Sequence, residues 1–200
     1  MNKTINKKRF DNIMKGTHVF LSWSVRALYV LMGFVLIGFL VALFIPKDLM
    51  NFDLDNIEHI NIQLSNVLYQ IDESLFTGII NVKWTLVLLG FMALANLAFL
   101  QFVMIYIRNI LRDTIDQNPF SDNNVNRLKY IGYGYLIASV VLPYINNLFF
   151  WQLIHQLDLF EATINFSIHF QSVFMGVIIL ILANIFDYGS YLQEDHDMTV

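Results

Sequence analysis

The sequence contains no cysteine among its 200 residues. Disulfide bonds, thiolate nucleophiles and cysteine-based metal or iron–sulfur sites are therefore excluded. Charged residues are also scarce, at 14% of the chain, where soluble domains have roughly 25%. Hydrophobic residues make up 56%, so the composition is that of a protein that resides in lipid.

Signature motifs of enzymes are missing as well. The sequence has no phosphate-binding loop, no HExxH, no GxSxG and no dinucleotide-binding glycine pattern. The adjacent residues Glu194, Asp195, His196 and Asp197 cannot all point at one ion, so no metal site is predicted there. We therefore expect a protein that is not an enzyme and that uses no cofactor or metal.

Long apolar segments without charge are what the sequence does contain. Four of them can cross a hydrocarbon core of roughly 30 Å as helices that rise about 1.5 Å per residue. We expect these spans over about residues 27–45, 84–107, 130–153 and 166–186. The predicted fold class is an all-α integral membrane protein with four transmembrane helices, and residues 1–200 form a single membrane domain.

Basic residues are distributed unevenly between the two sides of the predicted spans. Ten Lys and Arg residues precede the first span or lie between the second and third, whereas two lie between the first and second. Loops with excess Lys and Arg stay in the cytoplasm. We therefore expect both termini inside, with a cytoplasmic loop at 108–129, an outer loop at 46–83 and a cytoplasmic tail at 187–200.

Two segments outside the spans repeat apolar residues at helical spacing. Residues 5–25 place basic residues on the opposite face, which predicts an interfacial N-terminal helix on anionic headgroups. Residues 57–75 follow a capping-box-like pair, Asp55 and Glu58, and precede Gly78, which predicts an amphipathic helix in the first outer loop. Anchoring and packing over the spans are the simplest roles, with lipid sensing and binding of a cationic peptide as alternatives.

Two further segments carry distinctive local patterns. The first is NPFSDNNVNRLKYIG, Asn118 to Gly132, in which Ser121 is a predicted cap for the next helix. The second is FDYGSYLQEDHDMTV, Phe186 to Val200, in which Gly189 is a predicted helix stop. Residues 192–200 are then expected outside the helix, as an acidic strip with apolar residues.

These segments, in a four-span chain of this length, resemble an uncharacterised family of small bacterial membrane proteins, domain of unknown function 2975. Members show Pro-Phe-Ser followed by Arg-Leu before the third span, and an ending with Gly, Leu-Gln-Glu-Asp, an acid and Thr-Val. The matching residues here are Pro119, Phe120, Ser121, Arg127, Leu128, Gly132, Gly189, Leu192, Gln193, Glu194, Asp195, Asp197, Thr199 and Val200. The resemblance covers nearly the whole chain, but the outer loop has no matching pattern.

The resemblance also implies a partner, because members are often encoded beside a small Cro/C1-type helix-turn-helix protein. We therefore expect a regulatory protein of the bacterial cell membrane that tethers or sequesters such a transcriptional regulator and does not itself bind nucleic acid. The predicted docking residues are Pro119, Phe120, Ser121, Arg127, Leu192, Gln193, Glu194, Asp195, Asp197, Thr199 and Val200. The alternatives are a small-solute transporter, an antimicrobial-peptide immunity or resistance protein, and a scaffold in a larger complex. The sequence predicts neither a ligand nor an oligomeric state.

Overall fold

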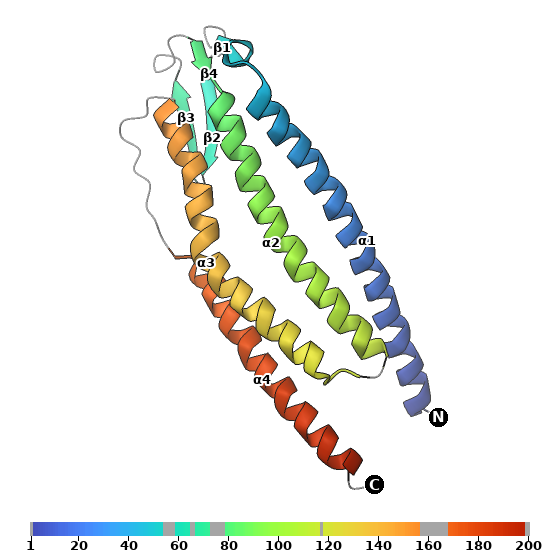
Figure 1. Ribbon diagram of the computed structural model, residues 1–200. Coiled ribbons are helices and arrows are strands. Elements are labelled where there is room, and N and C mark those ends of the chain that lie inside the picture. The colour runs from blue at the N-terminus through green and yellow to red at the C-terminus, as the bar shows by residue number, and fades with distance from the viewer. Residues whose placement is uncertain are drawn as a thin grey trace. The chain divides into compact units, whose positions relative to one another are not determined.

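Four helices make up most of the structure (Figure 1). The computed structural model describes residues 2–53, 59–64, 67–72, 79–116, 118–156 and 168–198, with side chains over 12–51, 81–116, 118–155, 168–192 and at 195. The helices are α1 (Asn2–Phe44), α2 (Lys83–Ile115), α3 (Asp122–Gln156) and α4 (Phe170–Met198). Each contains a segment long and apolar enough to cross a membrane. The prediction of four spans is confirmed, and the chain is a multi-pass membrane protein.

The chain divides into two compact units. The first unit comprises Met1–Phe34, Ala95–Pro143 and Ser167–Val200, and the second comprises Val35–Leu94 and Tyr144–Phe166. The turn from α2 to α3 and the contacts of α3 with α4 belong to the first unit. The strands belong to the second.

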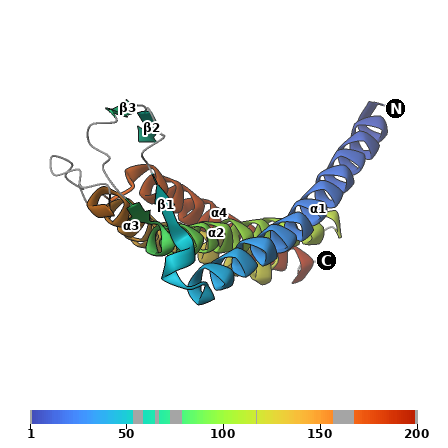
Figure 2. The same cartoon turned by 90° about the horizontal axis from the view of Figure 1, so that it is seen from above.

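Helix α1 is longer than the predicted first span (Figure 2). The leader is helical, as predicted, and it continues into the span without a break. At about 1.5 Å per residue, a helix from Asn2 to Phe44 is about 64 Å long, roughly twice the thickness of the hydrocarbon core. The Arg26 guanidinium lies 5.5 Å from the centre of the Trp23 ring, and this pairing of residue types is typical of the membrane–water interface.

The prediction of an amphipathic helix over residues 57–75 is wrong, because this segment contains a pair of strands. Strands β2 (His59–Leu64) and β3 (Val67–Asp72) pair antiparallel through all of their residues. The predicted capping residues and the predicted stop, which are Asp55, Glu58 and Gly78, lie outside the described residues.

A second pair of short strands connects the end of α1 to the start of α2. The strands are β1 (Asn51–Asp53) and β4 (Ile79–Asn81), which pair antiparallel. The 3-10 helix η1 (Lys47–Met50) precedes β1. The Asn81 side-chain amide donates to the Lys47 carbonyl and to Asn51 Oδ1, both at 2.7 Å. Lys83 Nζ donates to the Ile45 carbonyl at 2.8 Å. These bonds hold the two helix ends together within the second unit.

The start of α4 is held by a carbonyl that a proline leaves free in α3. Pro143 has no N–H, so the carbonyl of Ser139, four residues earlier, receives no helical hydrogen bond from it. The His169 N–H donates to this carbonyl at 3.0 Å. The His169 carbonyl accepts from the N–H groups of Ser172 and Val173, as the residue before a helix does. The proline is therefore compatible with the span, and the carbonyl that it leaves free binds the residue just before α4.

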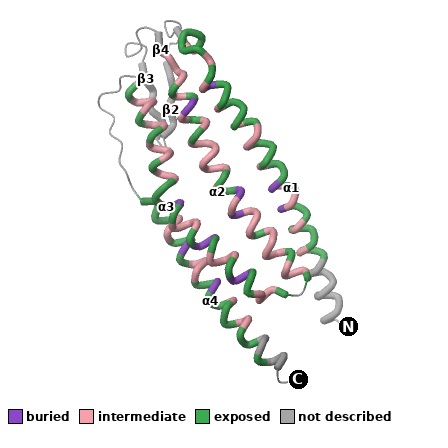
Figure 3. Tube along the Cα trace, viewed as in Figure 1, coloured by how far each residue is buried: buried purple, intermediate pink, exposed green. Residues whose placement is uncertain are grey.

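Few side chains are buried, and they are scattered along the helices (Figure 3). In the first unit the buried apolar residues are Leu21, Val25, Val103, Val125, Ile131, Ala138 and Ala183. Large apolar side chains are exposed along all four helices. Such a surface is stable in lipid, because lipid is itself apolar and the backbone groups inside a helix are paired with one another.

Candidate functional site

The connection between α2 and α3 is a tight turn. We predicted a loop over residues 108–129, but α2 continues to Ile115 and α3 begins at Asp122. Ser121 Oγ accepts a hydrogen bond from the Asn124 N–H at 3.4 Å, so the predicted cap is confirmed. The Asp122 carboxylate lies in the first turn of α3, where its negative charge interacts favourably with the positive end of the helix dipole. The sequence therefore ends one helix and starts the next within a few residues.

Asn124 is the centre of a polar cluster inside this turn. Its side chain is fully buried. Its amide nitrogen donates to the carbonyls of Asn118 at 3.4 Å and Pro119 at 3.2 Å. Its Oδ1 accepts a hydrogen bond from the Arg127 guanidinium at 2.7 Å. One side chain thus pairs two turn carbonyls and orients a cation.

Arg127 pairs with Asp113, which joins the first turns of α3 to the last turns of α2. Both side chains are only 19% exposed. Arg112 also lies near Asp113, at 3.8 Å, but its side chain is 62% exposed. Water screens the inner pair less, so Arg127 contributes more than Arg112 to holding the two helices. Its guanidinium is engaged within the chain rather than presented to solvent.

Phe120 attaches the turn to α4. Its ring centre lies 5.2 Å from that of Phe186. A Cβ atom at Gly189 would lie 2.8 Å from Phe120 Cδ1, closer than real side chains approach, so a larger residue would force the ring to move. The prediction that Gly189 ends the fourth helix is wrong, because α4 continues to Met198. The glycine is a contact position within the helix.

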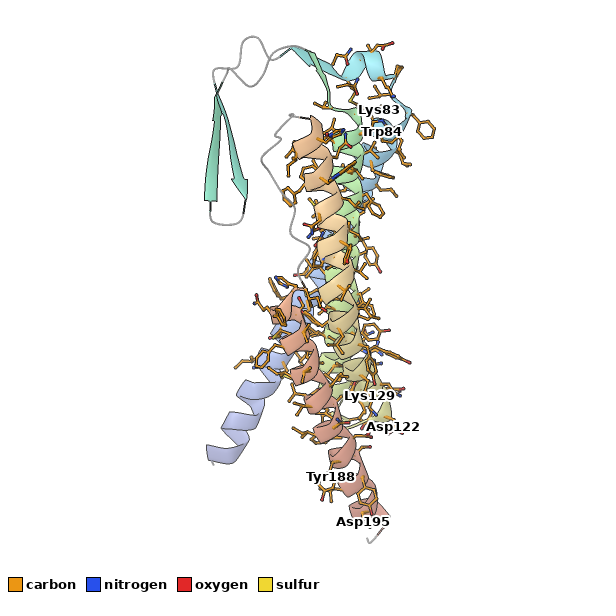
Figure 4. The ribbon with its side chains drawn as sticks, turned by 90° about the vertical axis from the view of Figure 1, so that its left-hand side faces the viewer. Lys83, Trp84, Asp122, Lys129, Tyr188 and Asp195 are labelled. Carbon is orange, nitrogen blue, oxygen red and sulfur yellow. The ribbon has the colours of Figure 1, made fainter. Side chains whose placement is uncertain are left out.

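Two polar pairs flank the Phe120 contact, and one member of each, Asp122 or Lys129, is labelled in Figure 4. Lys129 Nζ donates to the Asp187 carboxylate at 3.0 Å, and Ser190 Oγ donates to Asp122 at 3.5 Å. Both pairs are largely exposed and contribute at most about 1 kcal/mol each. We call these contacts the α4 clamp. Its members are Phe120, Asp122 and Lys129 on the turn and α3, and Phe186, Asp187, Gly189 and Ser190 on α4.

Beyond the α4 clamp the chain stays helical. Residues 192–200 were predicted outside the helix, which is wrong for the described part of that segment, up to Met198. Tyr188, Tyr191, Leu192 and Asp195 are exposed. The side chains of Gln193, Glu194 and Asp197, and residues Thr199 and Val200 altogether, lie outside the described part of the chain.

The structure divides the predicted docking residues into two groups. Pro119, Phe120, Ser121 and Arg127 come together in the turn, where each makes a contact within the chain. Leu192 and Asp195 lie further along α4 and are exposed.

Sequence reasoning missed several members of the site, which are Asp113, Asn124, Lys129, Phe186 and Asp187. Asp113 could have been found as the acid that precedes the turn at Pro119, opposite Arg127 after it. The backbone contact of Asn124 could have been found, because Asn124 follows the cap Ser121 by three residues, the position whose N–H such a cap binds. Phe186 and Asp187 carry no such local signal, because their partners belong to another helix.

The site offers hydrogen bonds, ion pairs and an exposed helix end. Across the described residues, no group of three or more His, Asp or Glu side chains that could hold a metal ion comes together. What the described contacts do chemically is hold α4 against the turn and α3.

Comparison with known proteins identifies the family that contains this site. Residues 67–200 match the family described as protein of unknown function (DUF2975). The chain belongs to DUF2975. The match contains the α2–α3 turn, the α4 clamp and the tail, so the predicted family is confirmed, but the match covers residues 67–200 rather than nearly the whole chain. Curated proteins and solved structures give no match.

Proposed function

We propose that this protein is a non-enzymatic regulator of the bacterial cell membrane that tethers or sequesters a small helix-turn-helix transcriptional regulator. The observation that carries the proposal is the end of α4. It is held on one side by the α4 clamp, continues past it as a helix, and exposes Tyr188, Tyr191, Leu192 and Asp195. A held and exposed helix end is suited to binding a protein.

Charge supports a partner with a basic surface. The tail carries Glu194, Asp195 and Asp197, and no Lys or Arg follows Lys129 in the sequence. DNA-binding domains present basic surfaces that are complementary to phosphate. Anionic headgroups of the cytoplasmic leaflet attract basic segments and repel acidic ones. The tail is therefore better suited to a basic protein than to the membrane surface.

The proposal requires both termini to be cytoplasmic, which the excess of basic residues favours. Reporters that are active only in the cytoplasm should be active when fused after Val200 or inserted at Asn118. Reporters that are active only outside should be active within residues 53–73. A cytoplasmic reporter that is active within residues 53–73 would contradict this orientation and the proposal with it.

Binding of the regulator is the direct test of the tail. The full-length protein should retain the adjacent helix-turn-helix protein in a pull-down, and a chain that ends at Gly189 should lose it. The charge reversal Glu194→Lys with Asp195→Lys should weaken retention, because it replaces two acids in a tail without bases. Each exposed charge pair contributes roughly 0.2–1 kcal/mol, so the loss on charge reversal should be partial.

The matched control makes the same charge reversal on the other side of the predicted membrane, as Asp48→Lys with Asp53→Lys. It should retain the regulator fully. Equal retention by the intact, shortened and tail-reversed chains would show that the tail is not the docking site. If the intact chain retains no regulator, the proposed function is wrong, and transport or peptide immunity becomes the reading to test.

A further inference from the structure

We propose that Arg26 binds the phosphate of an anionic phospholipid, drawn inward from the headgroup layer to a level at which the neighbouring helices carry no charge. The site consists of Arg26 and Trp23 on an exposed side of α1, and we call it the Arg26 site. The inference is independent of the proposed function, because it requires neither a regulator nor a particular orientation of the chain in the membrane.

Three helices of the first unit share one level at which their uncharged segments begin. The rings of Tyr106 on α2 and Tyr130 on α3 have centres 5.9 Å apart. Arg108 follows Tyr106 by two residues, and Lys129 directly precedes Tyr130. Lys129 Nζ donates to the Asp187 carboxylate on α4 at 3.0 Å. From this level inward, the segments predicted as the second, third and fourth spans contain no Asp, Glu, Lys or Arg.

The backbone of Arg26 lies inside this level. Gln101 Nε2 donates to the Val25 carbonyl at 3.3 Å, which places α1 at Val25 beside α2 at Gln101. Seven residues separate Gln101 from Arg108, which is about 10 Å along a helix. Arg26 follows Val25, and α1 and α2 are consecutive antiparallel helices (Figure 1). Arg26 is therefore about 10 Å inward of Arg108.

The Arg26 side chain is not part of the contact between α1 and α2. Val25, whose carbonyl binds α2, is 2% exposed. Arg26 is exposed, and Trp23 is 65% exposed. Trp23 and Arg26 are three residues apart and share one face of α1, with the guanidinium 5.5 Å from the ring centre. A pair typical of the membrane–water interface thus occurs at a level where the adjacent helices are uncharged.

The chain offers Arg26 no carboxylate. The sequence contains no Asp or Glu between Asp11 and Asp48, and the nearer of these two acids is about 20 Å from Arg26 along the helix. The ion pairs among the described residues involve other cations. An exposed cation at the level of hydrocarbon is costly unless an anion accompanies it. The anion therefore comes from outside the chain.

A phospholipid phosphate is the anion best suited to this position. A guanidinium pairs with phosphate through two parallel N–H donors. The long arginine side chain extends toward the interface while the headgroup moves inward, so each covers part of the distance. A zwitterionic headgroup brings its own cation, whereas phosphatidylglycerol has a net negative charge that neutralises Arg26. Free phosphate would have to leave water without an acyl chain to anchor it.

The test measures which lipid collects beside Trp23. The full-length chain carries Trp84→Phe and Trp151→Phe, which leaves Trp23 as the one tryptophan of the three in the sequence. Nanodiscs of phosphatidylcholine contain a minor fraction of phosphatidylglycerol, with bromine on the acyl chains of either lipid. At equal brominated fractions, phosphatidylglycerol should quench Trp23 as if it were enriched roughly fivefold, the ratio that one cation gives at an anionic surface. Arg26→Gln should abolish this difference.

The matched control is Lys15→Gln, which removes another exposed cation from α1. Lys15 is about 16 Å from Arg26 along the helix, so the enrichment at Trp23 should remain. Arg26→Leu, an apolar replacement suited to hydrocarbon, should lose the enrichment as Arg26→Gln does, so the result does not depend on how well one variant folds. Phosphatidylglycerol should also raise the thermal unfolding midpoint of the chain that keeps Arg26, because a ligand of the folded state stabilises it.

Each outcome supports or overturns the Arg26 site. Equal quenching by the two brominated lipids in the chain that keeps Arg26, or enrichment that survives both Arg26 variants, overturns it. Enrichment that Lys15→Gln abolishes as well would assign lipid binding to the overall charge of α1 and overturn the specific site. Inorganic phosphate should not reduce the enrichment beyond a chloride control of the same ionic strength. A specific reduction would show that the site takes free phosphate and not a lipid.

Discussion

Replacing Arg127 by methionine is expected to lower the free energy of unfolding by about 2–4 kcal/mol. The substitution removes the only guanidinium that contacts both Asp113 and Asn124 among the described residues. The Asp113 carboxylate, at 19% exposure, would then lack its close partner. Asn124 would keep its bonds to the turn carbonyls but lose the donor to its Oδ1. The apparent free energy of unfolding in detergent micelles, from denaturant titration, measures the effect.

The matched control is Arg112→Met, which removes a cation from the same carboxylate at an exposed position. It should cost less than about 1 kcal/mol, as exposed ion pairs do. Arg127→Met combined with Asp113→Leu should recover part of the loss, because the carboxylate is no longer left without a partner. Equal effects of Arg127→Met and Arg112→Met would show that burial does not distinguish the two arginines.

The Arg127 cluster also matters for the tail. It sets the geometry of the turn, the turn carries Phe120, and Phe120 contacts Phe186 and Gly189 on α4. The residues of the first motif segment thus have a structural role that places the second segment. The contacts of Phe120 with Phe186 and Gly189 are the physical link between the two segments.

The spans and the turn were predictable because their signals are local. Uncharged apolar runs of sufficient length require helices in lipid, where every backbone group must be paired within the segment. Ser121 and Asp122 have the helix-start chemistry that the structure shows. The contact of Phe120 with Gly189 was not predictable, because it joins residues that are far apart in the sequence.

The outer segment shows how one sequence can fit two periods. Apolar residues at Ile60, Leu64, Val67 and Ile71 fit helical spacing, but Ile62 lies between the first two and completes an alternation of period two. In the observed register Ile60 is opposite Ile71, and Leu64 is opposite Val67. The two periods share Ile60, Leu64, Val67 and Ile71, and the β-branched isoleucines favour the strand.

The tail was mispredicted for a different reason. Gly189 is a common residue just after a helix end, because it accepts a left-handed conformation. Here the glycine serves close packing instead, since a Cβ atom would meet the Phe120 ring. A glycine in sequence alone does not distinguish these two uses, and the partner that decides between them lies on another element.

Replacing Gly176 by alanine is expected to destabilise the contact between α3 and α4 by about 1–3 kcal/mol, as overpacking of a close contact does. A Cβ atom at Gly176 would lie 2.9 Å from the Gly132 carbonyl oxygen. A backbone carbonyl of a helix cannot rotate away as a flexible side chain can, so the two helices must separate. The Leu136 side chain, 3.0 Å from the same position, closes the remaining space.

The matched control is Gly33→Ala in α1, where a Cβ atom would meet no atom within 4 Å. Alanine has the higher helix propensity, so this change should leave the stability unchanged or raise it by up to about 1 kcal/mol. Denaturant titration of both variants in the same detergent gives the comparison. Because both substitutions add one methyl group to a helical glycine, an opposite sign assigns the loss at Gly176 to the close approach of α3 and α4. Equal stability of the two variants would contradict that approach.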